Sequence, residues 1–112
     1  MNTLLFLYVG AGLLLVTLAI PLIFEKVPPN PIYGMRTSVT LSDPRLWYPA
    51  NRYTGKWLFG IGIGNVITAV GLYLIPSLSV DAYALLCLAV FVVLFGIGIW
   101  RSFVYLKDLQ KK

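Results

Sequence analysis

The sequence predicts an all-α membrane protein in which three transmembrane helices form a single membrane domain over residues 1–112. Three uncharged apolar runs carry this prediction, at residues 1–24, 57–80 and 82–100, because an α-helix needs about 20 residues to cross a hydrocarbon core. The composition agrees, since 59% of the residues are hydrophobic and only 12% are charged, against about 25% in an ordinary soluble domain. We expect spans near residues 4–24, 57–76 and 83–104, with a loop at 25–56.

The first span is expected to stay in the protein as a helix rather than act as a secretory signal peptide. It lacks a positively charged start, its apolar stretch is longer than that of a usual signal, and no Ala-x-Ala-like site precedes Glu25. Pro21 removes one backbone donor near the end of this span, which predicts a kink in the last turn.

The loop at 25–56 is predicted to begin with an extended, proline-rich strap. Prolines at positions 28, 29 and 31 stop the first helix, because each lacks an N–H and pushes the residue before it toward extended geometry. Gly34 permits a turn with positive φ. Such a turn would present the side chain of Arg36 at the membrane surface.

An amphipathic helix is predicted for the rest of the loop, and it leads into the second span. Ser42 is the expected N-cap, with Asp43 and Pro44 in the first turn. Pro49 predicts either a kink or a helix start delayed toward Tyr48. One face of this helix is basic and carries Arg45, Arg52 and Lys56. The nearly opposite face carries Trp47, Asn51, Thr54 and Leu58.

Small residues form a predicted helix-packing stripe on the second span. The stripe consists of Gly60, Gly64, Thr68 and Gly71, which fall within about 80° of one another on a helix and would let another helix approach closely. Asn65 lies beside the stripe. Its amide predicts either an interhelical hydrogen bond that fixes packing or a polar point on a ligand path.

The positive charges indicate the orientation of the protein. Loop 25–56 and the tail after residue 100 each have a net charge of +3, whereas the N-terminus and the turn between the second and third spans contain no Lys or Arg. By the positive-inside rule, the N-terminus lies outside, and the loop and the C-terminus are cytoplasmic. The same cations predict contact with anionic lipid headgroups, and their placement beside the spans argues against a nucleic-acid partner.

No residue pattern predicts an enzyme, a metal site or a cofactor. The chain contains no histidine, its four carboxylates are widely separated, and Cys87 is its single cysteine, so His-based catalysis and Cys-based zinc binding are excluded. The run GIGIG at 60–64 is interpreted as a helix-packing segment, because a phosphate-binding loop needs a preceding strand. No carboxylate lies deep in a span, which counts against an autonomous proton-coupled transporter.

Arg36 and Arg52 are the candidate ligand-binding cations of the loop. Arg36 lies between Gly34 and the pair Thr37-Ser38, and Arg52 follows Asn51, one helical turn after Trp47 and Tyr48. Two interpretations remain open for them. They are either interfacial charges that set the topology, or parts of a cytoplasmic-face pocket for an anionic or peptide group, since a guanidinium suits carboxylates and phosphates.

The run PNPIYGMRTSVTLSDPRLWYPANRYTGK at 29–56 resembles the signature loop of the SdpI family of bacterial membrane proteins. The family pattern is an Asn, then Gly-x-Arg-Thr, then Thr-Leu, then a Trp followed by an Asn and a Gly. It falls on Asn30, Gly34, Arg36, Thr37, Thr40, Leu41, Trp47, Asn51 and Gly55. This chain departs from the family in two respects: larger relatives have additional N-terminal spans, and the corresponding helix commonly continues smoothly where this chain has Pro49.

The resemblance implies a non-enzymatic immunity protein of the bacterial plasma membrane, which protects the cell against a secreted, membrane-active toxic peptide. Some members also recruit a repressor to the membrane. With this family role in view, the candidate ligand- or partner-binding residues are Asn30, Tyr33, Gly34, Arg36, Thr37, Trp47, Asn51 and Arg52.

Two alternative functions remain. The first is a subunit of an oligomeric transporter or channel, suggested by the glycine stripe with Asn65, and it would require a homo-oligomer because three helices enclose little volume. The second is a lipid-binding or ligand-binding membrane protein whose cationic loop organises anionic headgroups.

Overall fold

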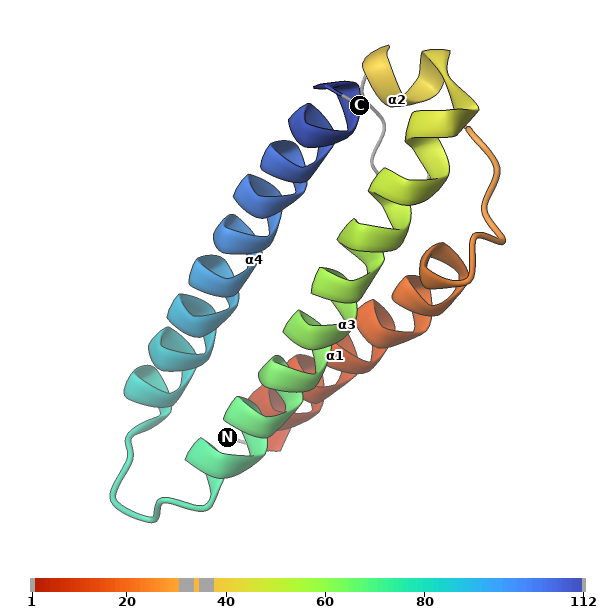
Figure 1. The fold of residues 1–112 in the computed structure, drawn as a ribbon. Coiled ribbons are helices and arrows are strands. Elements are labelled where there is room, and N and C mark those ends of the chain that lie inside the picture. The colour runs from red at the N-terminus through yellow and green to blue at the C-terminus, as the bar shows by residue number, and fades with distance from the viewer. Residues whose placement is uncertain (1, 31–33, 35–37, 112) are drawn as a thin grey trace.

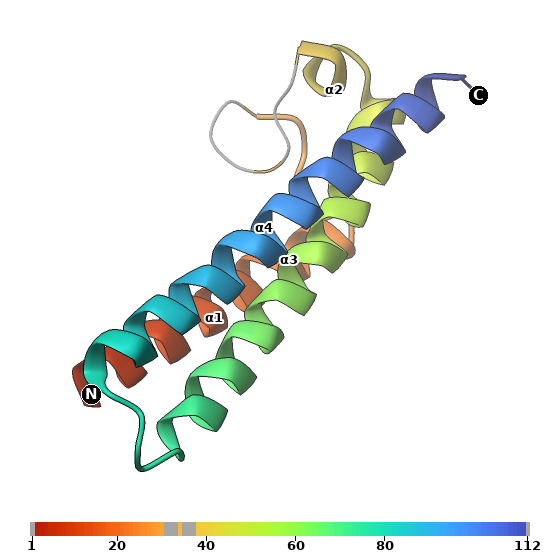
Figure 2. The same ribbon diagram turned by 90° about the vertical axis from the view of Figure 1, so that its left-hand side faces the viewer.

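The fold consists of three long helices and one short one. The computed structural model describes residues 2–30, 34 and 38–111, with helices α1 (Asn2–Ile23), α2 (Ser38–Ser42), α3 (Pro44–Tyr73) and α4 (Val80–Lys111). α1, α3 and α4 are each long and apolar enough to cross a membrane, and the described ranges contain no strand. α3 packs against both α1 and α4, and the three long helices run along the same general direction in Figure 1 and Figure 2. The prediction of an all-α membrane protein with three transmembrane helices is confirmed.

The second span and the amphipathic segment before it form one continuous helix, α3. Its N-cap is Asp43 rather than the predicted Ser42, which is the last residue of α2. A carboxylate oxygen of Asp43 accepts a hydrogen bond from the Arg45 backbone N–H at 2.9 Å, and this bond lowers the pKa of Asp43. Pro44 occupies the first turn, where its missing N–H costs no helical hydrogen bond.

Pro49 lies inside α3, so the alternative of a helix start delayed to Tyr48 is wrong. The first turn is already stabilised by the Asp43 cap, and a proline at that depth removes only one backbone hydrogen bond. The short helix α2 was not predicted. α4 also extends beyond the expected span of 83–104, because its polar last turns continue the helix to Lys111.

Small residues let α1 and α3 approach each other closely. A Cβ added to Gly62 would lie only 2.5 Å from the Gly12 carbonyl oxygen, and one added to Gly12 would lie 2.6 Å from the Gly62 carbonyl oxygen. One added to Gly55 would lie 3.2 Å from the Ala19 carbonyl oxygen. Gly55, Gly62 and Ala69 are spaced by seven residues, or about two helical turns. They therefore form one small-residue side of α3 that faces α1.

The small-residue stripe predicted for the second span, Gly60, Gly64, Thr68 and Gly71, does not form the contact with α1. No atom of a neighbouring helix lies within 4 Å of where a Cβ on Gly60 or Gly71 would be, whereas a Cβ on Gly64 would lie 3.3 Å from Leu94 of α4. Thr68 is half-buried. Gly60 and Gly62 point about 200° apart on a helix, so the run GIGIG places glycines on several faces. The closest approach to α1 falls on Gly62, which the stripe did not include.

Side-chain hydrogen bonds tie the three long helices together near the N-terminal end of α1. The Asn65 amide nitrogen donates to the Tyr8 carbonyl at 2.8 Å, so this residue makes an interhelical bond between α3 and α1. The Tyr8 hydroxyl donates to the Ala84 carbonyl of α4 at 3.0 Å. The Tyr83 hydroxyl of α4 donates to the Ala69 carbonyl of α3 at 2.8 Å. All three helices are therefore joined at this end of the bundle.

Gly62→Ala is expected to lower the free energy of unfolding in detergent micelles by about 1–3 kcal/mol, because a methyl group at the backbone contact overpacks it. Gly71→Ala is the matched control on the same helix, and it is expected to leave stability unchanged or raise it by up to about 1 kcal/mol, because alanine favours a helix more than glycine does and meets no neighbour here. Unfolding followed by circular dichroism measures both. Equal stability of the two variants would contradict the assigned contact between α1 and α3.

Candidate functional site

Trp47 attaches the strap, which is the segment that follows α1 and includes Val27, to α3. Its side chain is fully buried, and its indole Nε1–H donates to the Val27 carbonyl at 2.8 Å. Twenty residues separate donor and acceptor in the sequence, and the bond joins the segment after α1 to the first turns of α3. A buried indole usually has such a partner, because an unpaired N–H away from water is costly. Trp47 is thus an anchor of the loop.

Asn51 lies one turn after Trp47, and Gly34 of the loop lies against its side chain. Its side chain is 2% exposed, and its amide nitrogen donates to the Trp47 carbonyl at 3.0 Å. Gly34 has a φ of +104°, and a Cβ added there would lie 2.6 Å from Asn51 Oδ1. A glycine is required at this position on both counts, since other residues disfavour positive φ and have no room beside Asn51.

The other predicted ligand-binding residues are distributed differently. The Asn30 amide nitrogen donates to the Pro28 carbonyl at 2.8 Å, which is a local bond within the strap. Arg52 is exposed and contributes to the lining of a hollow that Trp47 and Asn51 do not line. The predictions for Tyr33, Arg36 and Thr37 lie outside the described residues. The structure brings Gly34, Trp47 and Asn51 together, and it leaves Arg52 apart from them.

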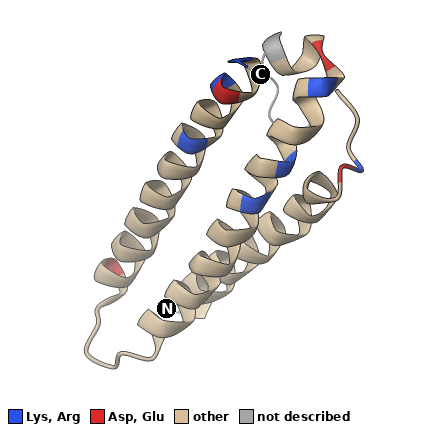
Figure 3. Ribbon diagram, viewed as in Figure 1, with Lys and Arg blue, Asp and Glu red and all other residues tan. Residues whose placement is uncertain are grey.

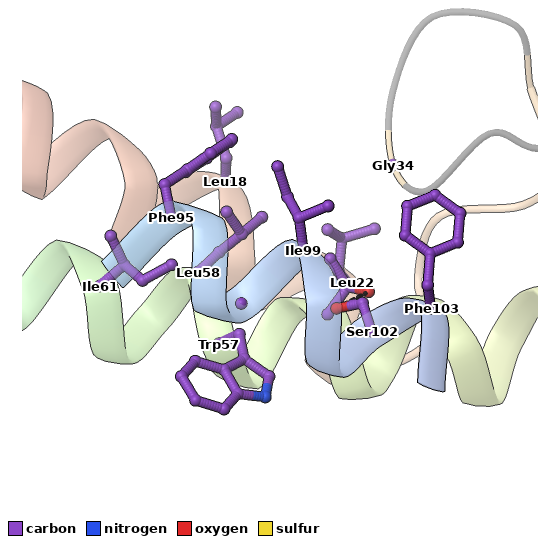
Figure 4. A pocket seen from close by; sticks show the side chains of 12 residues that line it. Leu18, Leu22, Gly34, Trp57, Leu58, Ile61, Phe95, Ile99, Ser102 and Phe103 are labelled. Atoms are coloured by element: carbon purple, nitrogen blue, oxygen red, sulfur yellow. Dashed lines mark hydrogen bonds between the residues drawn. The ribbon is translucent and has the colours of Figure 1, made fainter. Parts of the chain in front are cut away.

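A cleft of about 330 Å³ opens between α1, α3 and α4, with Gly34 of the strap at its rim. Figure 4 shows apolar side chains from all three helices around it. The Thr54 hydroxyl in its wall donates a hydrogen bond to the Ser102 hydroxyl at 3.0 Å. The lining residues are Leu18, Leu22, Gly34, Thr54, Trp57, Leu58, Ile61, Phe95, Gly98, Ile99, Ser102 and Phe103.

The cleft exists because α1 and α4 pack closely on different parts of α3. Gly55 admits α1 closely to α3 near Leu22, and Gly98 admits α4 closely to Ile61 and Trp57 of α3. Between these two contacts α1 and α4 remain separated, and side chains of the three helices line the space between them. Sequence reasoning missed the cleft, since Leu, Ile and Phe line any membrane span. The available signal was a hydroxyl residue in each of two membrane-spanning helices, Thr54 in α3 and Ser102 in α4.

The lining of the cleft suits an apolar group. None of its lining residues is titratable, and no group of three His, Cys, Asp or Glu side chains is placed to hold a metal ion in the described part of the chain. A mostly apolar pocket of this volume, with a small polar group in its wall, is typical of a small apolar ligand site.

Fold and site together define an α-helical, multi-pass membrane protein in which the loop between the first two spans folds back onto the second span. The model of the SdpI/YfhL protein family matches residues 26–102. The chain is also 36% identical over 81 residues to the uncharacterized protein YfhL of Bacillus subtilis (strain 168), and the match covers 72% of each chain. This chain belongs to the SdpI/YfhL protein family. No solved structure matches it.

Trp47→Phe is expected to loosen the strap, because the smaller phenyl ring fills the buried site less well and the bond to the Val27 carbonyl is lost. The loss of about 1 kcal/mol corresponds to about fivefold faster trypsin cleavage after Lys26 in detergent, where cleavage follows local opening. The control is Trp100→Phe, which alters an exposed tryptophan of α4. Cleavage at the wild-type rate in Trp47→Phe would show that the bond does not hold the strap.

Proposed function

We propose that this protein is a non-enzymatic membrane protein that protects the bacterial plasma membrane against a membrane-active toxic peptide. The cleft between α1, α3 and α4 is the observation that carries the proposal. Family membership supports it, because the signature loop at 29–56 resembles that of immunity proteins. The peptide is bound inside the membrane and is not chemically altered.

The size and lining of the cleft suit one or two apolar side chains of such a peptide. Its volume of about 330 Å³ lies at the lower end of the range for ligand pockets, about 300–1,000 Å³, so a whole helix does not fit. The paired hydroxyls of Thr54 and Ser102 offer a hydrogen bond to a peptide group near the bound side chains, which is favourable where no water competes.

The distribution of charge supports an orientation with the strap and the C-terminus in the cytoplasm. Figure 3 shows the described Lys and Arg residues towards the end that carries α2 and the C-terminus. The turn at 74–79, at the other end, contains no Lys or Arg. Positive-inside logic then places the cleft in the inner half of the bilayer. A peptide that enters from outside reaches it only after insertion into the membrane.

Ile99→Trp is expected to abolish most of the protection, because a larger ring fills the cleft. The matched control is Ile97→Trp. Ile97 is 41% exposed, close to the 46% of Ile99, but it does not line the cleft. Depolarisation of sensitive bacteria by candidate membrane-active peptides measures protection, with membrane levels of each variant checked by immunoblot. Equal protection by the two variants would show that the cleft is not the peptide site. If cells with the wild-type protein are as sensitive to every peptide as cells without it, the proposed function is excluded.

The orientation is tested with single cysteines in a Cys87→Ala background. A membrane-impermeant thiol reagent is expected to label Ser77→Cys in intact cells, because the exposed turn at 74–79 faces outside. Gln110→Cys, at an exposed position near the end of α4, is expected to react only after the cells are opened. The reverse pattern would place the strap outside.

A further inference from the structure

A second groove lies where α3 and α4 meet, and no residue of α1 lines it. It consists of two adjoining hollows of about 320 and 360 Å³, which share Tyr53 and Lys56. The first hollow is also lined by Glu25, Pro49, Arg52 and Tyr105. The second is also lined by Trp57, Gly60, Ile61 and Leu94. The groove therefore leads from a charged end to an apolar end.

The charged end presents two cations that have no ion pair with any described residue. Arg52 and Lys56 are both exposed, and they lie one helical turn apart on α3. The one salt bridge among the described residues joins Arg45 and Asp43, outside the groove. With Glu25 on the rim, this end has a net charge of +1, which suits a single phosphate group.

Aromatic rings form the wall beside these cations. Tyr53 of α3 and Tyr105 of α4 are stacked, with ring centroids 4.2 Å apart and planes inclined by 6°. Tyrosine favours the height of lipid headgroups, where its ring lies against acyl chains and its hydroxyl is in water. The stacked pair therefore places the charged end of the groove at the membrane surface, and the apolar end below it in the hydrocarbon.

The apolar end has room for a chain because of Gly60. No atom of a neighbouring helix lies within 4 Å of the position that a Cβ on Gly60 would take. Arg52, Lys56 and Gly60 are spaced by four residues, so they descend one side of α3 in steps of about 6 Å. A phosphate at the first two residues thus continues into an acyl chain that passes over the third.

We propose that this groove is a binding site for an anionic glycerophospholipid, with its phosphate at Arg52 and Lys56 and one acyl chain over Gly60. The site does not depend on the proposed protection against a peptide, because its characteristic residues lie outside the cleft. Glu25 accepts a hydrogen bond from a hydroxyl of the headgroup, which favours phosphatidylglycerol over a headgroup that lacks donors. A soluble phosphate would use the cations but leave the apolar half of the groove empty.

Native mass spectrometry of the full chain in detergent tests the site, with phosphatidylglycerol and phosphatidylcholine of identical acyl chains as the probes. We expect retained phosphatidylglycerol adducts on the wild type. Lys56→Gln and Arg52→Gln should each weaken these adducts about fivefold, the effect expected for one surface cation near an anionic lipid. Lys107→Gln, at an exposed cation elsewhere on α4, is the matched control and should leave the adducts unchanged.

Gly60→Leu tests the acyl half of the groove, with Gly71→Leu as its control on the same helix. Gly60→Leu should weaken the binding of both lipids, whereas Gly71→Leu should leave the binding of both unchanged. Equal retention of the two lipids by the wild type would overturn the proposal. Displacement of phosphatidylglycerol by inorganic phosphate at equal concentration would also overturn it. So would the finding that the protein forms a dimer and that Gly60→Leu abolishes the dimer without weakening lipid binding.

Discussion

The backbone contact between α1 and α3 at Gly12 and Gly62 is the constraint on which the rest of the structure depends. Lipid tails are as apolar as the side chains of a span, so helices in a membrane associate through close packing and hydrogen bonds rather than through burial from water. The carbonyl of each glycine lies where a Cβ on the other would clash. This contact fixes the position of α1 on α3, and the hydrogen bond from Asn65 to Tyr8 reinforces it.

The position of α1 then determines where the loop begins and what it can reach. α1 ends beside Gly55 of α3, where Leu22 and Ile23 lie close to it, and from there the next segment reaches the start of α3, where Trp47 bonds the Val27 carbonyl. The signature residues Trp47, Asn51 and Gly34 are explained by this architecture, since Trp47 fastens the strap at Val27 and only a glycine fits at position 34 beside Asn51. Their importance in the sequence pattern is therefore compatible with a role in building the loop, and direct contact with a ligand is not needed to explain them.

α4 is joined to the other two helices by the tyrosine contacts at one end and by the Thr54–Ser102 hydroxyl pair towards the other. α1 and α4 do not pack on each other along their whole length, which leaves a space between them. A second space lies on the other side of α4, where Gly60 of α3 leaves room. The space next to α1 is apolar throughout, apart from two hydroxyls, and the proposed peptide site lies there. The space away from α1 combines cations, stacked tyrosines and an open glycine, and the proposed lipid site lies there.

The sequence by itself determined the fold class, the three membrane spans and membership of the family. Those properties follow from local features: the length of apolar runs, the positions of prolines and the spacing of residues in the signature loop. Local reasoning also placed Trp47 and Asn51 on the side of the helix opposite Arg52, because helical periodicity alone decides that. It misplaced the N-cap by one residue, since Ser42 and Asp43 are both good caps and α2 ends at the first of them.

Only the tertiary structure decided which glycines meet another helix, where the strap lies and that a cleft exists. Glycines at alternate positions in GIGIG point to different faces, and periodicity does not reveal which face α1 covers. The bond from Trp47 to Val27 spans 20 residues, and its acceptor is a backbone carbonyl that has no sequence signature. The cleft and the groove arise where helices fail to touch. Each depends on the relative placement of separate spans, which no single segment of the sequence encodes.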